Sequence, residues 1–157
     1  ETKANEYHKA SKEWFVSEEI TINTNNEWSY MDSPNPSYRA FQSSSNWHIP
    51  SSTATMSFTI KGYEQFTFYM RSNGETNHDY LMVGLDSKPT ESENKSENEF
   101  NTKGKSNGDS SFDSYKPVTF NNLNKSRSYT IYVVYRKDKT ENMANDRGYV
   151  LIPYAKQ

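Results

Sequence analysis

Short runs in which apolar and polar side chains alternate with a period of two constrain this chain more than any other feature. The clearest run, SYTIYVVYR, covers residues 128–136. This period predicts a β-strand, because successive side chains of a strand point to opposite faces of the sheet. The second face of the run carries Tyr132 and Val134, so both faces are apolar and the run is predicted to be a central strand. The first face consists of Tyr129, Ile131, Val133 and Tyr135.

Similar runs recur from residue 20 onward, separated by turns rich in Asn, Gly, Ser and Pro. No long amphipathic helix is predicted after residue 20. The chain is therefore expected to be all-β, an antiparallel β-sandwich, and a jelly roll is favoured because the number of strands is high. Strands are predicted at 55–61, 65–71, 80–85, 117–123, 128–136 and 149–153, with weaker ones at 20–23, 28–31, 38–42 and 99–103.

The alternation also predicts which side chains face the core of the sandwich. Along each strand, the side chains at the positions between the inward-facing residues, which include Tyr69, are predicted to point outward. The inward set is Met56, Phe58 and Ile60, then Phe66, Phe68 and Met70, and then Leu81, Val83 and Leu85.

With 157 residues, the chain has about the length of one domain. Residues 1–13 are interpreted as a linker or an N-terminal arm, and residues 14–157 as a single β-sandwich domain. Residues 86–114 contain almost no apolar side chains apart from Phe100 and Phe112, so they are interpreted as a long polar loop. Such a loop is either solvated or becomes ordered over a ligand.

Composition excludes several classes of function. The absence of cysteine excludes disulfides and thiolate metal sites. The net charge of −2, without a basic block, makes nucleic-acid binding unexpected. No apolar stretch approaches the roughly 20 residues that span a membrane, so membrane insertion is not expected. A chain rich in Asn, Ser, Thr and Tyr favours an extracellular, cell-surface or virion location.

The sequence motifs of common catalytic sites are absent. His8, His48 and His78 are scattered, and no GxSxG, HExxH or P-loop motif occurs. The chain is therefore not expected to be an enzyme. Two carboxylates brought together by folding, as in glycoside hydrolysis, remain an open alternative.

Aromatic side chains in polar surroundings suggest a sugar-binding surface. Trp47 lies in the turn-rich stretch SSSNWHIP, and Tyr69 and Tyr132 lie on strand faces opposite the predicted core. Rings of this kind can stack on the C–H faces of sugars while polar neighbours bind the hydroxyl groups. The alternative is that these rings belong to the core or its rim, where sandwiches commonly place Tyr and Trp.

Two polar loops follow strong strands and carry acidic residues. Glu75 and Asp79 follow the strand at 65–71, and Asp138 and Asp146 follow the strand at 128–136, which ends in Arg136. If these strands are neighbours, one edge holds these acids together with two or three of Arg71, Arg136 and Arg147. The four acids and Arg136 are predicted to be structural anchors there. Asp79 and Asp146 are also candidate ligands of a structural calcium ion, and no other cofactor is expected. The remaining alternative is that the acids cap turns.

From Trp28 to Pro153, about four-fifths of the chain, the sequence resembles jelly-roll modules of bacterial and phage surface proteins, similar to galactose-binding-like and cleaved-adhesin-type domains. The resemblance implies a jelly roll in a secreted or virion-attached protein, with glycan binding or attachment as its function and calcium in some members. The chain departs from the pattern at VLIPY, where many members carry an acid after the residue that matches Ile152. The matching segments are NEWSYMDSPNPSYRAFQSSS, FTFYMRSNGETNHDYLMV, with Glu75 and Asp79, and TIYVVYRKDKTENMANDRGYVLI.

These observations predict a noncatalytic binding module of a secreted or surface protein. The expected partner is a glycan or a cell-surface receptor, and oligomers are compatible with the sequence. The alternative is a structural or assembly domain of a phage tail or surface array, which acts through protein–protein contacts.

Overall fold

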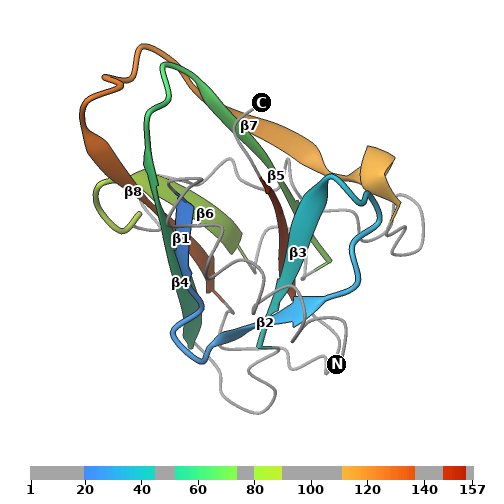
Figure 1. Cartoon of the computed structure of the whole chain (residues 1–157). Coiled ribbons are helices and arrows are strands. Elements are labelled where there is room, and N and C mark those ends of the chain that lie inside the picture. The colour runs from blue at the N-terminus through green and yellow to red at the C-terminus, as the bar shows by residue number, and fades with distance from the viewer. Residues whose placement is uncertain (1–19, 45–51, 74–79, 90–110, 137–146, 155–157) are drawn as a thin grey trace.

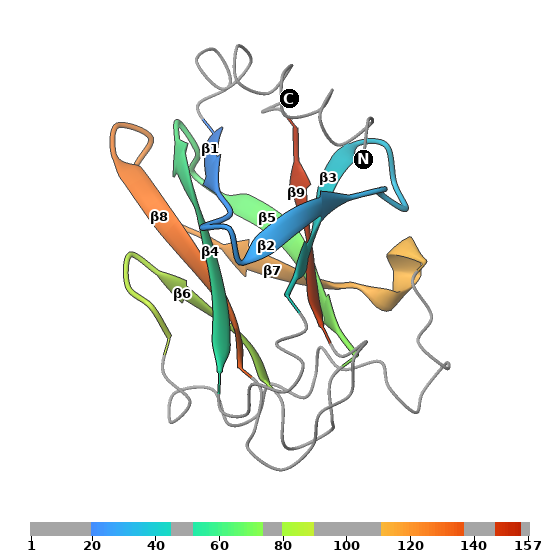
Figure 2. The same ribbon diagram turned by 90° about the horizontal axis from the view of Figure 1, so that it is seen from below.

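Two antiparallel sheets pack face to face and form a β-sandwich, as Figures 1 and 2 show. The computed structural model describes residues 20–44, 52–73, 80–89, 111–136 and 147–154. The four-stranded sheet contains, in spatial order, β1 (Ile20–Asn23), β4 (Thr53–Lys61), β8 (Ser128–Arg136) and β6 (Tyr80–Leu85). The five-stranded sheet contains β2 (Trp28–Met31), β3 (Tyr38–Ser43), β9 (Gly148–Pro153), β5 (Phe66–Ser72) and β7 (Lys116–Phe120). A short 3-10 helix, η3 (Phe112–Ser114), precedes β7.

The chain changes sheet at every connection between these strands except the one from β2 to β3. Each observed strand pair is antiparallel, including β4 with β8 and β3 with β9. The all-β fold and the antiparallel sandwich are therefore confirmed. Frequent changes of sheet are compatible with a jelly roll, and that finer assignment stays a prediction.

The core lies between the two sheets and follows the predicted alternation. Phe58 of β4 contacts two rings of the opposite sheet, with centroid distances of 5.8 Å to Phe66 and 5.2 Å to Phe68. Burying an aromatic or branched side chain of this size contributes about 1.5–3 kcal/mol. Trp28 is also buried here, so it is a core residue. The inward residues of the central strands are Met56, Phe58, Ile60, Ile131, Val133, Tyr135, Phe66, Phe68 and Met70.

Most predicted strands appear with nearly the predicted bounds, and β8 lies between β4 and β6 as a central strand should. The strand predicted at 117–123 ends at Phe120, because Asn122 adopts a positive φ of 60° and reverses the chain. In β6, Leu81 is buried on the core side as predicted, but Met82 on the other face is buried as well. The strand predicted at 99–103 lies outside the described residues.

The condition set for a shared edge, that strands 65–71 and 128–136 are neighbours, is not met. The corresponding strands, β5 and β8, belong to different sheets, so Arg71 and Arg136 are not cross-strand neighbours. Both strands nevertheless end at the same end of the sandwich, near the start of β9. There Ser72 is in register with Gly148, while a Cβ on Gly148 would lie 2.7 Å from Leu81 of the opposite sheet.

Candidate functional site

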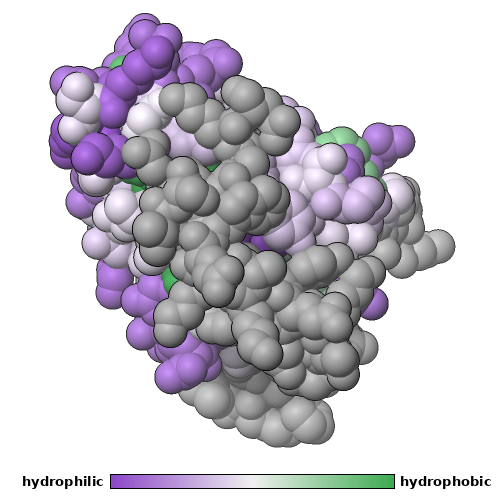
Figure 3. Space-filling model, viewed as in Figure 1, coloured by the Kyte–Doolittle hydropathy of each residue, from purple (hydrophilic) through white to green (hydrophobic). Residues whose placement is uncertain are grey.

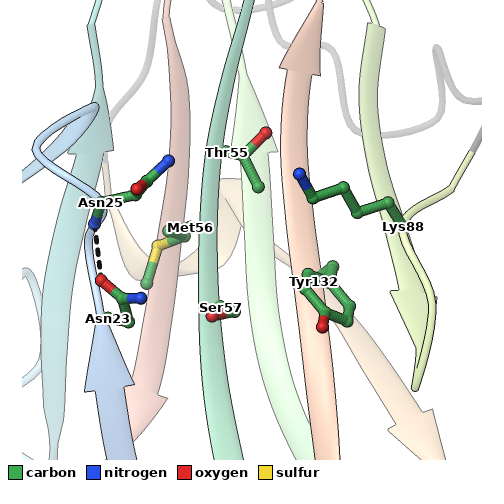
Figure 4. Close-up of a pocket in the computed structure, with 7 residues that line it drawn as sticks. All are labelled: Asn23, Asn25, Thr55, Met56, Ser57, Lys88 and Tyr132. Carbon is green, nitrogen blue, oxygen red and sulfur yellow. Dashed lines mark hydrogen bonds between the residues drawn. The ribbon is translucent and has the colours of Figure 1, made fainter.

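A hollow of about 140 Å³ lies on the outer face of the four-stranded sheet. Its floor is formed by β4 and β8, one wall by the end of β1 and the following turn, and the other wall by the chain after β6, as Figure 4 shows. The lining residues are Asn23, Asn25, Thr55, Met56, Ser57, Lys88 and Tyr132.

The floor of the hollow follows from strand alternation. Because Met56, Phe58, Ile131 and Val133 point into the core, the residues between them point outward. Ser57 and Tyr132 are in register on the paired strands β4 and β8. Side chains at such opposed positions lie about 5 Å apart at their Cβ atoms, so the hydroxyl of Ser57 and the half-buried ring of Tyr132 form one continuous surface.

The first wall is a tight turn that begins where β1 ends. Asn25 and Asn26 have φ values of 56° and 58°, and the Glu27 amide donates to the Thr24 carbonyl oxygen at 3.0 Å. Two successive positive φ values closed by this bond are characteristic of a type I′ turn, which Asn tolerates better than most residues. The Asn25 amide also donates to Asn23 Oδ1 at 2.9 Å, which fixes the Asn23 side chain at the rim of the hollow.

Glu27 joins this turn to the floor. The pairing of β1 with β4 ends at Asn23 and Ser57, so β1 offers no partner to the Thr55 amide. The carboxylate of Glu27 accepts that hydrogen bond instead, at 2.6 Å. The carboxylate takes the place of the backbone carbonyl that a longer β1 would have provided as acceptor, and the bond holds the turn against β4.

The second wall forms because the chain folds back over the sheet after β6. A Cβ on Gly84 would lie 2.3 Å from the Ser87 carbonyl oxygen and 3.2 Å from Pro89 Cδ. Only glycine leaves room for this close approach. Pro89 is buried there, and Lys88 is carried to the edge of the hollow.

Asp86 holds in place the segment after β6 that folds back over the sheet. Its φ is 64°, and its amide donates to the Thr130 carbonyl oxygen at 2.6 Å. Its carboxylate accepts from the Thr130 amide at 3.0 Å and from Arg127 Nη2 at 2.5 Å. Arg127 in turn lies over the ring of Tyr129 at 4.3 Å. Asp86 thus continues the β6–β8 pairing by one residue and sets the point from which Lys88 departs.

The chemistry of the hollow is that of a hydrogen-bonding site with one aromatic ring and one cation. The lining offers two side-chain amides, two aliphatic hydroxyls, a phenol and an ammonium group. It contains no carboxylate and no imidazole. The hollow can therefore bind polar groups and present a ring face.

Of the three predicted ligand-binding residues, the structure places Tyr132 in this hollow and Tyr69 elsewhere. Tyr69 lies on the outer face of the five-stranded sheet, with ring centroids 5.4 Å from Tyr38 and 5.0 Å from Phe112 of η3. Burial raises the pKa of the Tyr38 hydroxyl, and the neighbouring Tyr69 hydroxyl raises it further. The structure therefore does not bring Tyr69 and Tyr132 together. Trp47 lies outside the described residues.

The predicted anchors are only partly described. Arg136 is half-buried at the end of β8, whereas Glu75, Asp79, Asp138 and Asp146 lie outside the described residues. Within the described part of the chain, no three Asp, Glu or His side chains gather in a way that could hold a metal ion. Calcium binding by Asp79 and Asp146 stays a prediction.

Two other arginines have structural contacts that the sequence did not show. Arg147 Nη1 donates to the Ser43 carbonyl oxygen at 2.7 Å, while its amide donates to Asn73 Oδ1 at 2.7 Å. These bonds connect the start of β9 to the ends of β3 and β5. Arg71 is buried and lies 4.0 Å over the ring of Tyr149. Such cation–π contacts contribute about 0.5–2 kcal/mol.

Sequence reasoning identified one residue of the hollow, Tyr132, and missed the others. Thr55 and Ser57 were predicted to face outward, but nothing local connects them with the β1–β2 turn. The Asn-Asn pair at 25–26 signals a turn, and Gly84 before Asp86 signals a close approach of the backbone. These signals locate the walls along the chain, but not their shared position on the sheet.

Comparison with known proteins gives likenesses of fold alone. No family model and no curated protein match the chain. The secreted serine protease VesC from Vibrio cholerae matches 89% of this chain at 10% identity with a TM-score of 0.46, and the chain spans only 25% of that protein. TmCBM61 in complex with beta-1,4-galactotriose matches 88% of this chain and 93% of that one, at 10% identity with a TM-score of 0.39. Neither likeness assigns a ligand.

None of the helices in the described part of the chain has the length and apolar composition that a membrane span requires.

Proposed function

We propose that this chain is a noncatalytic carbohydrate-binding module that holds one sugar unit of a glycan in the hollow over β4 and β8. The observation that carries the proposal is the position of Tyr132, which is in register with Ser57 and shares the lining of the hollow with Thr55, farther along β4, and with Asn25 on the opposite wall. An aromatic face flanked by hydrogen-bonding groups matches the two surfaces of a sugar, its C–H face and its hydroxyl groups.

The floor of the hollow is suited to binding because it is rigid. Tyr132, Thr55 and Ser57 project from the longest paired strands of the sheet, and Glu27 secures the Thr55 backbone. A preformed site loses little conformational entropy when the ligand binds. The volume of about 140 Å³ is below the roughly 300–1,000 Å³ of pockets for drug-sized ligands. The hollow therefore suits a single ring of a longer chain.

A noncatalytic role agrees with the chemistry of the lining. Glycoside hydrolysis requires two carboxyl groups about 5–10 Å apart across the bond that is cleaved. The lining supplies none, and Glu27 beside it is engaged by the Thr55 amide. A sugar placed in the hollow would be bound without being cleaved.

The alternative role in assembly receives little support from the visible surface. On the face shown in Figure 3, the coloured residues are mostly hydrophilic or near neutral, with small hydrophobic spots. Obligate interfaces generally need a wider apolar patch. In addition, the edge strand β7 begins with Lys116 and Pro117, and both residue types discourage pairing with another strand.

A glycan array followed by titration calorimetry tests the proposal. Tyr132→Ala should weaken binding of the best glycan roughly three- to tenfold, because the ring face is lost. Tyr132→Phe should keep most of the affinity, since the ring remains. Tyr69→Phe is the matched control, because it removes the same hydroxyl on the opposite sheet, and it should bind like the wild type.

Two results would contradict the proposal. One is a wild-type protein that binds no glycan while light scattering shows a stable oligomer, which would favour assembly. The other is a Tyr132→Ala variant that folds normally and binds with unchanged affinity.

A further inference from the structure

The hollow has an uneven distribution of charge. Lys88 is its one charged lining residue, and no ion pair of Lys88 is found in the described part of the chain. The acid on the β1 side, Glu27, accepts a hydrogen bond from the Thr55 amide at 2.6 Å. The hollow thus combines an ammonium group, for which the described residues provide no acidic partner, with side chains that can donate hydrogen bonds.

The backbone that carries Lys88 is held in place. Pro89 and the Ser87 carbonyl lie against Gly84, and Asp86 is bonded to the Thr130 backbone through both its amide and its carboxylate. Figure 4 shows the side chain of Lys88 reaching from the β6 side across β8 towards Thr55. The fold therefore directs this lysine over the floor of the hollow, although its side chain remains exposed to solvent.

We infer that the sugar bound in the hollow is anionic, and that Lys88 binds its carboxylate or sulfate group. This inference rests on the proposed carbohydrate-binding function. An ammonium group is a compact charge that binds an anion without a fixed geometry, which suits either group. Hydrogen bonds between charged partners are roughly twice as strong as neutral ones, so the charge would dominate the preference. The hydroxyls of Thr55 and Ser57 can donate to the remaining anion oxygens.

The test compares pairs of ligands that share one sugar chain and differ chiefly in charge. Titration calorimetry would use an oligogalacturonide and its methyl ester, in which the same sugar chain has lost its carboxylate charge. A second pair would consist of a sulfated galactose oligosaccharide and its unsulfated form. The wild type should bind the charged member of at least one pair about fivefold or more tightly. That preference should fall as salt rises from 50 to 500 mM, because salt screens exposed charges.

Two variants assign the preference to a residue. Lys88→Gln should lower the affinity for the charged ligand to that for its neutral counterpart. The affinity for the neutral ligand should stay unchanged. Lys61→Gln is the matched control, since Lys61 is also an exposed lysine of the four-stranded sheet but does not line the hollow. It should keep the preference.

The outcomes separate this inference from the function on which it rests. Equal affinity of the wild type for charged and neutral members would overturn the inference and leave carbohydrate binding in place. No binding of any member, together with an empty glycan array, would overturn both. A preference that persists in Lys88→Gln would refute the role of Lys88. Preference for the sulfated pair alone would support the inference and identify sulfate as the anion.

Discussion

At the scale of single residues, the candidate site depends on one position that lacks a side chain. Gly84 lies in β6 with a negative φ, so its backbone conformation would accept other residues. The requirement for glycine comes from the chain that folds back over it, with the Ser87 oxygen 2.3 Å from where a Cβ would be. The position of Lys88 thus depends on Gly84, four residues earlier in the chain.

Gly84→Ala should therefore affect both stability and binding. The added methyl group must displace the backbone at Ser87, and overpacking of this kind costs about 1–3 kcal/mol. Urea unfolding should show that loss, and calorimetry should show a weaker preference for the charged oligosaccharide. Lys88→Gln is the comparison, because it should lose the preference with unchanged stability. A Gly84→Ala protein with wild-type unfolding and binding would show that the contact is not needed.

At the scale of elements, the strands were predictable and their neighbours were not. Alternation with a period of two is local, so the bounds of β1, β2 and β8 could be taken directly from the sequence. The choice of partner depends on packing between distant segments. The strands at 65–71 and 128–136 have similar apolar faces, and both faces point into one core, but from opposite sheets.

The same reason explains why most of the hollow escaped prediction. Tyr132 could be selected because the outward face of a strand is visible in its own pattern. Asn25 and Lys88 come from a turn and a fold-back more than 60 residues apart, and only the spatial order β1-β4-β8-β6 brings them to one surface. The sequence showed a polar stretch at Lys88, but it did not show that Asp86 and Pro89 attach this stretch to the sheet.

The turn between β1 and β2 provides an element-scale prediction. Glu27→Ala should lower the free energy of unfolding by about 1–2 kcal/mol, because the Thr55 amide loses a charged acceptor. Glu27→Gln keeps an acceptor and should lose less. Glu64→Ala is the control, since its 3.8 Å contact with Lys125 is exposed and should contribute at most a few tenths of a kcal/mol. Equal effects of Glu27→Ala and Glu64→Ala in urea unfolding would contradict this role of Glu27.

At the scale of the whole molecule, the two sheets depend on one shared core. Nearly every connection crosses from one sheet to the other, so neither sheet consists of a continuous piece of chain. The inner faces meet through rings such as Phe58 of β4 and Phe68 of β5, both fully or almost fully buried. Small domains of this kind generally unfold as a single unit. The hollow on the four-stranded sheet should therefore share the stability of the five-stranded sheet.

Phe58→Ala tests this dependence. Removing a buried ring should cost about 3–5 kcal/mol, a large part of the 5–15 kcal/mol that stabilises a typical domain. Because Phe58 contacts both Phe66 and Phe68 across the core, hydrogen exchange should accelerate by similar factors in β4 and β8 and in β5 and β9. Phe58→Leu, which keeps most of the volume, should produce the same pattern at a smaller magnitude. Faster exchange confined to β4 and β8 would mean that the sheets open independently, and the hollow could then be lost while the rest of the molecule stays folded.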